Sequence, residues 1–387
     1  MYDFDGALDR APYDCLKWSY LGGCCPDRDD ILPMWIADMD LAAPQAVLDA
    51  LRKRAEHPVY GYAGKPDGYY EAYRSWMRQR YAQDIDRSWI LFSPGIVPAI
   101  ASAIRAYTKA GEGVCIMPPV YHPFASLIKA NGRAVREAPL VIQDGRYELD
   151  LARLDAAASV SKVLILCTPH NPVGRVWTRE ELEAIADIAE KRDLIVVADE
   201  IHADLVYAPH RHIPSMAVSE RFNERLVTAW APSKTFNIAG LQTSYIVVPN
   251  PALRKALAAD IDASGIGVPN CFGSAAAEAA YTQGGPWLDA LLPYLKGNFE
   301  HLRDELKRRA PALTVYPCEG TFLAWIDFKG AGLSGDLHQT LLSKAGLWLD
   351  AGARFGTGGS GFARLNFGCP RAMLDEAIER LAGAFGS

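Results

Sequence analysis

Lys234 is the residue of this sequence whose surroundings best suit covalent chemistry. It lies in the stretch APSKTFNIAGL (residues 231–241), which follows the apolar run RLVTAW (residues 225–230). Such a run is typical of a buried parallel strand, and the carboxyl ends of these strands face the crevice where open α/β sheets bind ligands. Because an amine held there is partly desolvated, its pKa falls and it can attack an aldehyde. A lysine taken in isolation would instead be interpreted as a surface residue.

Three upstream motifs favour the chemical interpretation. The run LIVVADE (residues 194–200) places Asp199 at the end of another buried strand, where a carboxylate needs a cationic partner. Asn171 lies in the turn TPHNPVG after the strand SKVLILC, and Gly95 lies in FSPGIVPAI, where a helix start offers backbone N–H groups to an anion. These four groups match the aldehyde, ring nitrogen, ring hydroxyl and phosphate of pyridoxal phosphate (PLP). We therefore predict that PLP is the cofactor.

Six motifs, in the same order and spread over nearly the whole chain, resemble those of the MalY/PatB-like cysteine-S-conjugate β-lyases. This group belongs to the fold-type I PLP enzymes of the class I/II aminotransferase family. The motifs are PMWIADMD (33–40), VYGY (59–62), PPVYHPF (118–124), DEIHADL (199–205), SKTFNIAGLQTSY (233–245) and ARLNFGCP (363–370). The resemblance implies an α/β fold: a large domain with a mostly parallel sheet and helices on both faces, plus a smaller α+β domain.

The same resemblance implies a carbon–sulfur β-lyase. Such an enzyme cleaves L-cystathionine or another cysteine S-conjugate by α,β-elimination to a thiol, pyruvate and ammonia. A PLP-dependent aminotransferase is the alternative, because it would use the same lysine, aspartate and asparagine. Ala231 replaces a serine that aminotransferases commonly carry, and Gln242 replaces a common arginine, which favours the lyase. A transcriptional regulator on this fold would need a DNA-binding helix-turn-helix ahead of these motifs.

Five residues receive roles at the cofactor ring from the resemblance. Lys234 binds the cofactor aldehyde and, once displaced by the substrate amine, removes the Cα proton. Asp199 keeps the ring nitrogen protonated, Asn171 donates to the ring oxygen and Tyr121 stacks on the ring. His202 stands where aminotransferases often have a tyrosine. We count it among the cofactor contacts and leave open which group makes the second contact to the ring oxygen.

The phosphate is expected on the backbone N–H groups of Gly95, Ile96 and Val97 and on Ser233. The resemblance adds Tyr60 from the neighbouring subunit, which implies a homodimer with a shared active site. Pattern alone would interpret Tyr60 as part of a loop before a helix.

Two further residues are implied to contact the amino-acid thioether substrate, together with Tyr60. Arg364 lies among apolar residues in a predicted strand, and a guanidinium there needs an anionic partner because it keeps its charge. Pattern alone favours a structural ion pair. The resemblance instead places Arg364 on the substrate α-carboxylate, and places the backbone near Ala37 against the substrate.

The chain divides into three predicted parts. Residues 1–45 form an arm that contributes to the small domain, residues 46–285 form the large PLP-binding domain, and residues 286–387 form the small domain. A helix is expected over 44–57, and Thr178 with Glu181 forms a capping box before another. Gly284, Gly285 and Pro286 should break the helical stretch 274–309 into two.

The amino-acid composition argues against several classes of protein. The chain has 387 residues, half of them hydrophobic, and a net charge of −6, which argues against nucleic acid or anionic membrane as a main partner. The amino terminus lacks the basic and apolar regions of a signal peptide, and no apolar run is long enough to span a bilayer. Eight scattered cysteines, with only Cys24 and Cys25 adjacent, indicate reduced thiols. We expect a cytoplasmic enzyme of amino-acid metabolism without a metal site.

Overall fold

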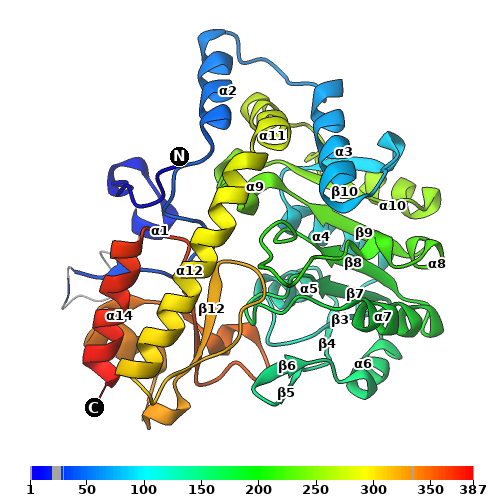
Figure 1. The fold of residues 1–387 in the computed structure, drawn as a ribbon. Helices are drawn as coiled ribbons and strands as arrows, with labels where there is room; N and C mark the ends of the chain where they lie inside the picture. Colours follow the sequence, from blue (N-terminus) through cyan, green and yellow to red (C-terminus); the bar gives the residue numbers. More distant parts are fainter. Residues whose placement is uncertain (1, 20–27, 29, 333–334, 387) are drawn as a thin grey trace.

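A seven-stranded sheet forms the centre of the molecule (Figure 1). This computed structural model describes residues 2–19, 28, 30–332 and 335–386. All strands of the sheet are parallel except β10, which runs antiparallel to both of its neighbours. In sheet order they are β2 (Ile90–Ser93), β10 (Ser244–Val247), β9 (Leu226–Trp230), β8 (Ile195–Asp199), β7 (Val163–Cys167), β3 (Gly113–Ile116) and β4 (Ala134–Glu137). The predicted mostly parallel sheet is therefore confirmed.

Helices cover both faces of this sheet, because its central strands are apolar on both sides. In β7, Val163 and Ile165 face a core shared with α4 (Ile96–Tyr107) and α10 (Pro251–Ala263). Leu164 and Leu166 face the opposite core, to which α6 (Leu151–Ala158) and α7 (Arg179–Lys191) contribute. Side chains of successive strand residues point to opposite faces, so a continuous apolar run needs two covering layers.

The order β9-β8-β7 brings the ends of three neighbouring strands to one edge. Cys167, the last residue of β7, pairs with Asp199, and Asp199 pairs with Ala229 of β9. The turns that follow these strands carry Asn171 and Lys234. Residues more than sixty positions apart are thus gathered by parallel pairing alone.

Two predicted helical features are present. α2 (Gln45–Glu56) occupies the stretch expected at 44–57. The long stretch is divided into α11 (Cys271–Gln283) and α12 (Gly285–Arg309), so the break occurs where the glycines and proline indicated, although α11 begins three residues earlier than expected. Pro286 is tolerated because a proline in the first turn of a helix removes no internal hydrogen bond.

A second, four-stranded antiparallel sheet lies in the carboxyl-terminal part. Its order is β11 (Thr314–Val315), β12 (Leu323–Asp327), β15 (Phe362–Asn366) and β14 (Asp350–Ala351). Figure 1 shows α12 and α14 (Arg371–Phe385) packed side by side next to it. The arm joins this part, because β1 (Leu32–Pro33) pairs with β13 (Leu347–Trp348). The boundaries at 45 and 285 stay a prediction.

The remaining α-helices and strands include α3 (Asp67–Tyr81) and α5 (Pro123–Ala130), which bury side chains in the core, and several short elements. The short elements are α1 (Leu16–Ser19), the hairpin β5 (Val141–Gln143) and β6 (Arg146–Glu148), α8 (Glu220–Asn223), α9 (Pro232–Thr235), α13 (Leu337–Thr340) and the π-helical turn Leu341–Ala345.

Within the described residues, no helix is both long and apolar enough to cross a membrane. The six described cysteines are free thiols, and Cys24 and Cys25 lie outside the described residues. The same part of the chain contains no cluster of His, Cys, Asp and Glu able to hold a metal ion.

The capping box of α7 can be tested by substitution. The Thr178 hydroxyl accepts from the Glu181 N–H at 3.2 Å, and Glu181 accepts from the Thr178 N–H at 2.7 Å. Thr178→Ala should lower the free energy of unfolding by about 1 kcal/mol, because one helix N–H loses its partner. Urea unfolding of Thr178→Ala and of the matched Thr178→Ser, which keeps the hydroxyl, measures this. Equal stability of the two variants would contradict the assignment.

Candidate active site

A cavity of about 390 Å³ lies at the carboxyl ends of the central strands. It gathers residues from the large sheet, the arm and the second sheet. Of the residues predicted from the sequence, it is lined by Ala37, Gly95, Ile96, Val97, Tyr121, Asn171, Asp199, His202, Ser233, Lys234 and Arg364. Tyr60 is the one predicted site residue that is not part of this lining.

Lys234 extends from the short helix α9 directly after β9. Its Nζ donates a hydrogen bond to the carbonyl oxygen of Ala37 in the arm. Burial lowers the pKa of the Lys234 amine to about 8, while the nearby Asp38 charge acts in the opposite direction. The amine is therefore far easier to deprotonate near neutral pH than an exposed lysine, as a nucleophile and proton acceptor requires.

Asp199 is the last residue of β8 and is only 4% exposed. One carboxylate oxygen accepts from the Ile201 N–H at 3.1 Å. In the described part of the chain, no cationic side chain forms a salt bridge with Asp199. Burial raises its pKa to about 7. A buried carboxylate without a cation fits a ligand that presents a protonated ring nitrogen.

Asn171 and His202 lie beside this carboxylate in the cavity lining. Asn171 Oδ1 accepts from Arg364 Nη1 at 3.0 Å, so its amide group is oriented by the arginine. The His202 Nδ1 is buried and has no hydrogen-bond partner. Burial lowers the pKa of His202 well below its usual value, so the imidazole is neutral. A free ring nitrogen here fits a polar group of a bound cofactor.

The start of α4 provides a place for an anion. Gly95 is the N-cap, and no side chain caps the helix. The N–H groups of Ile96 and Val97 lie in the first turn of the helix, so they have no acceptor within it. The positive end of the helix dipole strengthens the attraction of these groups for an anion. Ser233 lines the same cavity. This arrangement fits the phosphate of PLP.

Arg364 lies on β15 and reaches the cavity from the second sheet. Its Nη2 donates to Asp350 Oδ2 at 2.9 Å and to the Trp35 carbonyl at 2.8 Å. The Arg364 Nε is buried without a partner. The structural ion pair that the sequence pattern favoured is therefore present, between Arg364 and Asp350. The guanidinium also has one donor, Nε, that is not used in a hydrogen bond.

Sequence reasoning missed several lining residues, including His122, Thr243, Asp350 and Arg354. Asp350 could have been sought, because a buried arginine requires a carboxylate. No local pattern indicates which acidic residue that would be. His122 and Thr243 lie in two of the motifs quoted above, PPVYHPF and SKTFNIAGLQTSY, which could have indicated them.

Tyr60 lies on the surface of its own chain, with 56% of its area exposed. Its hydroxyl donates to the Ala55 carbonyl at 2.8 Å, and its ring stacks on Phe272 with the centroids 5.8 Å apart. A contact between Tyr60 and the cofactor of a neighbouring subunit stays a prediction.

A lysine, a buried carboxylate without a salt bridge and an uncapped helix start at one edge of a mostly parallel sheet define the site of a fold-type I PLP protein. The residues present fit this cofactor at its aldehyde, ring and phosphate. The chain belongs to the aminotransferase class I and II family, whose sequence pattern matches residues 30–381.

Comparison with individual proteins shows which members of this family the chain resembles. The chain is 39% identical to the cystathionine beta-lyase PatB of Bacillus subtilis over 99% of both chains. It is 35% identical to the protein MalY of Escherichia coli, again over 99% of both. The structure of cystalysin from Treponema denticola, which contains pyridoxal 5'-phosphate, superposes with a TM-score of 0.96 at 36% identity and covers 99% of this chain and 98% of that chain. The MalY/PatB-like resemblance drawn from the motifs is confirmed.

The raised pKa of Asp199 predicts a titration near pH 7 in protein freed of its cofactor. Infrared spectra recorded as the pH is raised from 5 to 9 should show a protonated carboxyl band that is lost with a midpoint near pH 7 in the wild type, and this component should be missing from Asp199→Asn. Between about pH 4 and 7 the folded chain keeps a proton that the unfolded chain releases, so this group's contribution to stability falls as the pH rises.

Asp350→Asn is the matched control. Burial alone would raise the pKa of Asp350, but the Arg364 charge and other partners lower it overall. This variant should therefore retain the band seen in the wild type. A wild-type spectrum without that band would contradict the assignment to Asp199.

Proposed function

We infer that this chain is a PLP-dependent carbon–sulfur β-lyase. Its substrate is L-cystathionine or another cysteine S-conjugate, which with one water yields a thiol, pyruvate and ammonia. One observation carries the proposal: Lys234, with its lowered pKa, and the buried Asp199, which has no salt bridge, line one cavity in a chain 39% identical to a cystathionine beta-lyase.

When bound, PLP supplies an electron-withdrawing ring that stabilises negative charge at the substrate Cα. Lys234 removes the Cα proton, which its low pKa permits near neutral pH. Asp199 holds a proton at the ring nitrogen, since a cation there replaces the partner that the buried carboxylate lacks. Tyr121 packs against the ring, and Asn171, held by Arg364, donates to the ring oxygen.

The substrate is oriented through its α-carboxylate. Arg364 is the cation of the second sheet that lines the cavity, and its unpartnered Nε is a donor for that carboxylate. The backbone near Ala37 closes the same side of the cavity. With the Cα proton directed at Lys234, the thiolate on Cβ leaves readily because a thiol is much more acidic than an alcohol.

The aminotransferase alternative uses the same residues up to the removal of the Cα proton. The chain is also 26% identical to a probable N-acetyl-LL-diaminopimelate aminotransferase of Bacillus subtilis, a more distant similarity than that to the lyases. Gln242, which is neutral, lines the cavity where aminotransferases commonly carry an arginine. This difference favours elimination over amino-group transfer.

We further propose that the enzyme acts as a homodimer in the cytoplasm. Tyr60 supports the dimer, because it lies at the surface, outside its own cavity, although the resemblance gives it a role at the phosphate and substrate. The free thiols of the described cysteines support a reducing compartment.

Product analysis tests the reaction. The purified enzyme loaded with PLP should convert L-cystathionine to homocysteine, pyruvate and ammonia without an added keto acid. Lys234→Ala should lose nearly all turnover, since both the covalent anchor and the proton acceptor are removed. Borohydride reduction and peptide mapping should fix the cofactor to Lys234 in the wild type. Amino-group transfer that requires a keto acid, with no thiol released from any conjugate, would establish the aminotransferase instead.

The shared site can be tested by mixing two inactive variants. Tyr60→Phe is expected to lose activity by weakened phosphate contact, and Lys234→Ala by loss of the amine. After subunit exchange, a heterodimer has one site with both native residues, so up to about one quarter of wild-type activity should return. A wild-type enzyme that sediments as a fully active monomer would contradict this prediction.

A further inference from the structure

Residues 35–41, here called the arm loop, contact two of the cations that line the proposed site. The carbonyl of Trp35 accepts from Arg364 Nη2 at 2.8 Å, and the carbonyl of Ala37 accepts from Lys234 Nζ. The directions of these two carbonyls therefore help to set where the substrate-binding guanidinium and the catalytic amine lie.

The arm loop is fastened to the two motifs that carry these cations. Asn237, three residues after the catalytic lysine, donates to two carbonyls of the loop at 2.8 Å each and accepts from the Met39 N–H at 2.9 Å. Asn366, on the strand of the substrate arginine, donates to the carbonyls of Ile36 and Asp38 at 2.7 and 2.5 Å. One loop thus bridges two parts of the site that different sheets supply.

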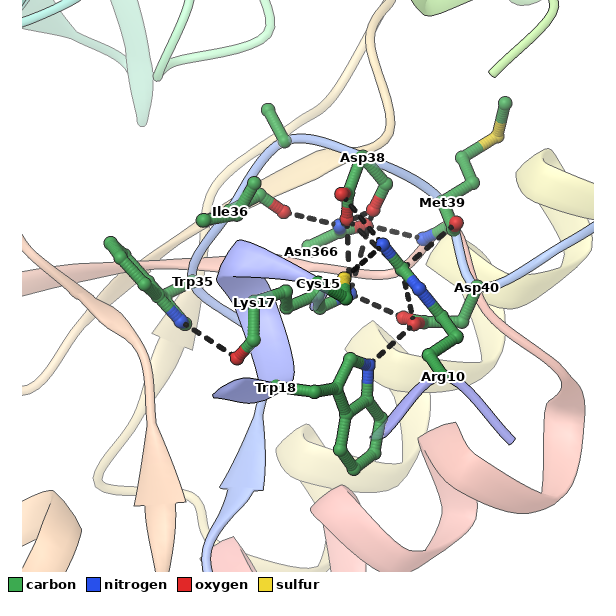
Figure 2. A network of polar contacts seen from close by, with 12 residues as sticks. Arg10, Cys15, Lys17, Trp18, Trp35, Ile36, Asp38, Met39, Asp40 and Asn366 are labelled. Atoms are coloured by element: carbon green, nitrogen blue, oxygen red, sulfur yellow. Dashed lines mark hydrogen bonds and ion pairs between the residues drawn. The ribbon is translucent and has the colours of Figure 1, made fainter. Parts of the chain in front are cut away.

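An ion cluster also holds the loop (Figure 2). Arg10 contacts both oxygens of Asp38, at 3.1 and 2.7 Å, and Asp40 Oδ1 at 2.6 Å. It also donates to the Met39 carbonyl at 3.2 Å. Lys17, which is 1% exposed, forms an ion pair with Asp40 Oδ2. Arg10 and Lys17 thus form ion pairs with the carboxylates of the loop, and Arg10 also donates a hydrogen bond to the loop backbone.

We propose that Arg10 and Lys17 are positioning residues for the β-lyase reaction: through Asp38 and Asp40 they hold the arm loop so that its carbonyls meet Arg364 and Lys234. The inference rests on the proposed function. Neither residue lines the cavity. Apolar packing could hold the loop with similar stability, but charged hydrogen bonds also fix the direction of its backbone.

The test compares holoenzymes of the wild type, Arg10→Gln, Arg10→Lys and Arg309→Gln. Arg309 is the matched control, because its guanidinium pairs with Glu379 on the surface between α12 and α14, outside the cavity lining. The first readout is hydrogen–deuterium exchange of the Met39 and Asp40 amides, which donate to Asn237 Oδ1 and to the Gly368 carbonyl. Exchange in Arg10→Gln should be about 10-fold faster than in the wild type, because the loop opens more often.

The second readout is steady-state kinetics with L-cystathionine. In Arg10→Gln the KM should rise about 10-fold, because a displaced Arg364 weakens carboxylate binding equally in the ground and transition states. The kcat should fall as well, because the same loop contacts the amine of Lys234. Arg10→Lys keeps the charge but loses the bidentate contact with Asp38, so its KM should lie between those of Arg10→Gln and the wild type. Lys17→Met is a second variant. Because burial of Lys17 makes unfolding a risk there, the partly exposed Arg10 carries the test.

Wild-type exchange rates and KM in Arg10→Gln would overturn the proposal, as would equal changes in Arg309→Gln. If the wild type releases no pyruvate from any cysteine conjugate, the proposed function fails. The exchange rates alone then decide whether the cluster fastens the loop.

Discussion

The burial of the Asp199 carboxylate at the end of β8 is the constraint on which the site depends. Ionising this group in the folded chain costs on the order of 4 kcal/mol, because burial raises its pKa. The two flanking strands end at the same level, so Asn171 and Lys234 emerge on either side of it. A protonated ring nitrogen supplies the missing cation. The binding of PLP therefore relieves an unfavourable interaction that the fold itself creates.

The second requirement is a cation on the far side of the cavity, and the carboxyl-terminal sheet provides it. Arg364 is buried on β15 and paired with Asp350 on the neighbouring strand. The same guanidinium orients Asn171 and bonds the carbonyl of Trp35 in the arm. The buried guanidinium of Arg364 thus forms hydrogen bonds with residues of the large domain, the small sheet and the arm. The geometry of the substrate site consequently depends on how these three parts pack, and the arm loop is the piece that touches the other two.

The sequence was most informative where a residue's role follows from its position on one element. Lys234 and Asp199 could be identified because each follows a continuous apolar strand, and the glycine–proline break before α12 is a local signal. Asp350, the partner of Arg364, was not identified, since any of several acids could have met that arginine. The pairing of Arg10 and Lys17 with Asp38 and Asp40 was missed for the same reason. Surface-type residues near the amino terminus become buried only when the arm folds against the body.

By itself, the sequence determined the mostly parallel sheet, the family, the cofactor and eleven of the residues that line the cavity. Each of these follows from hydrophobic patterning or from short motifs, in which neighbouring positions carry the signal. Only the tertiary structure decided which charges meet. Ion pairs such as Arg364 with Asp350, and Lys17 with Asp40, join residues 14 and 23 positions apart on different elements. Their distances are set by how sheets and arm pack together, and no local pattern in the chain specifies that packing.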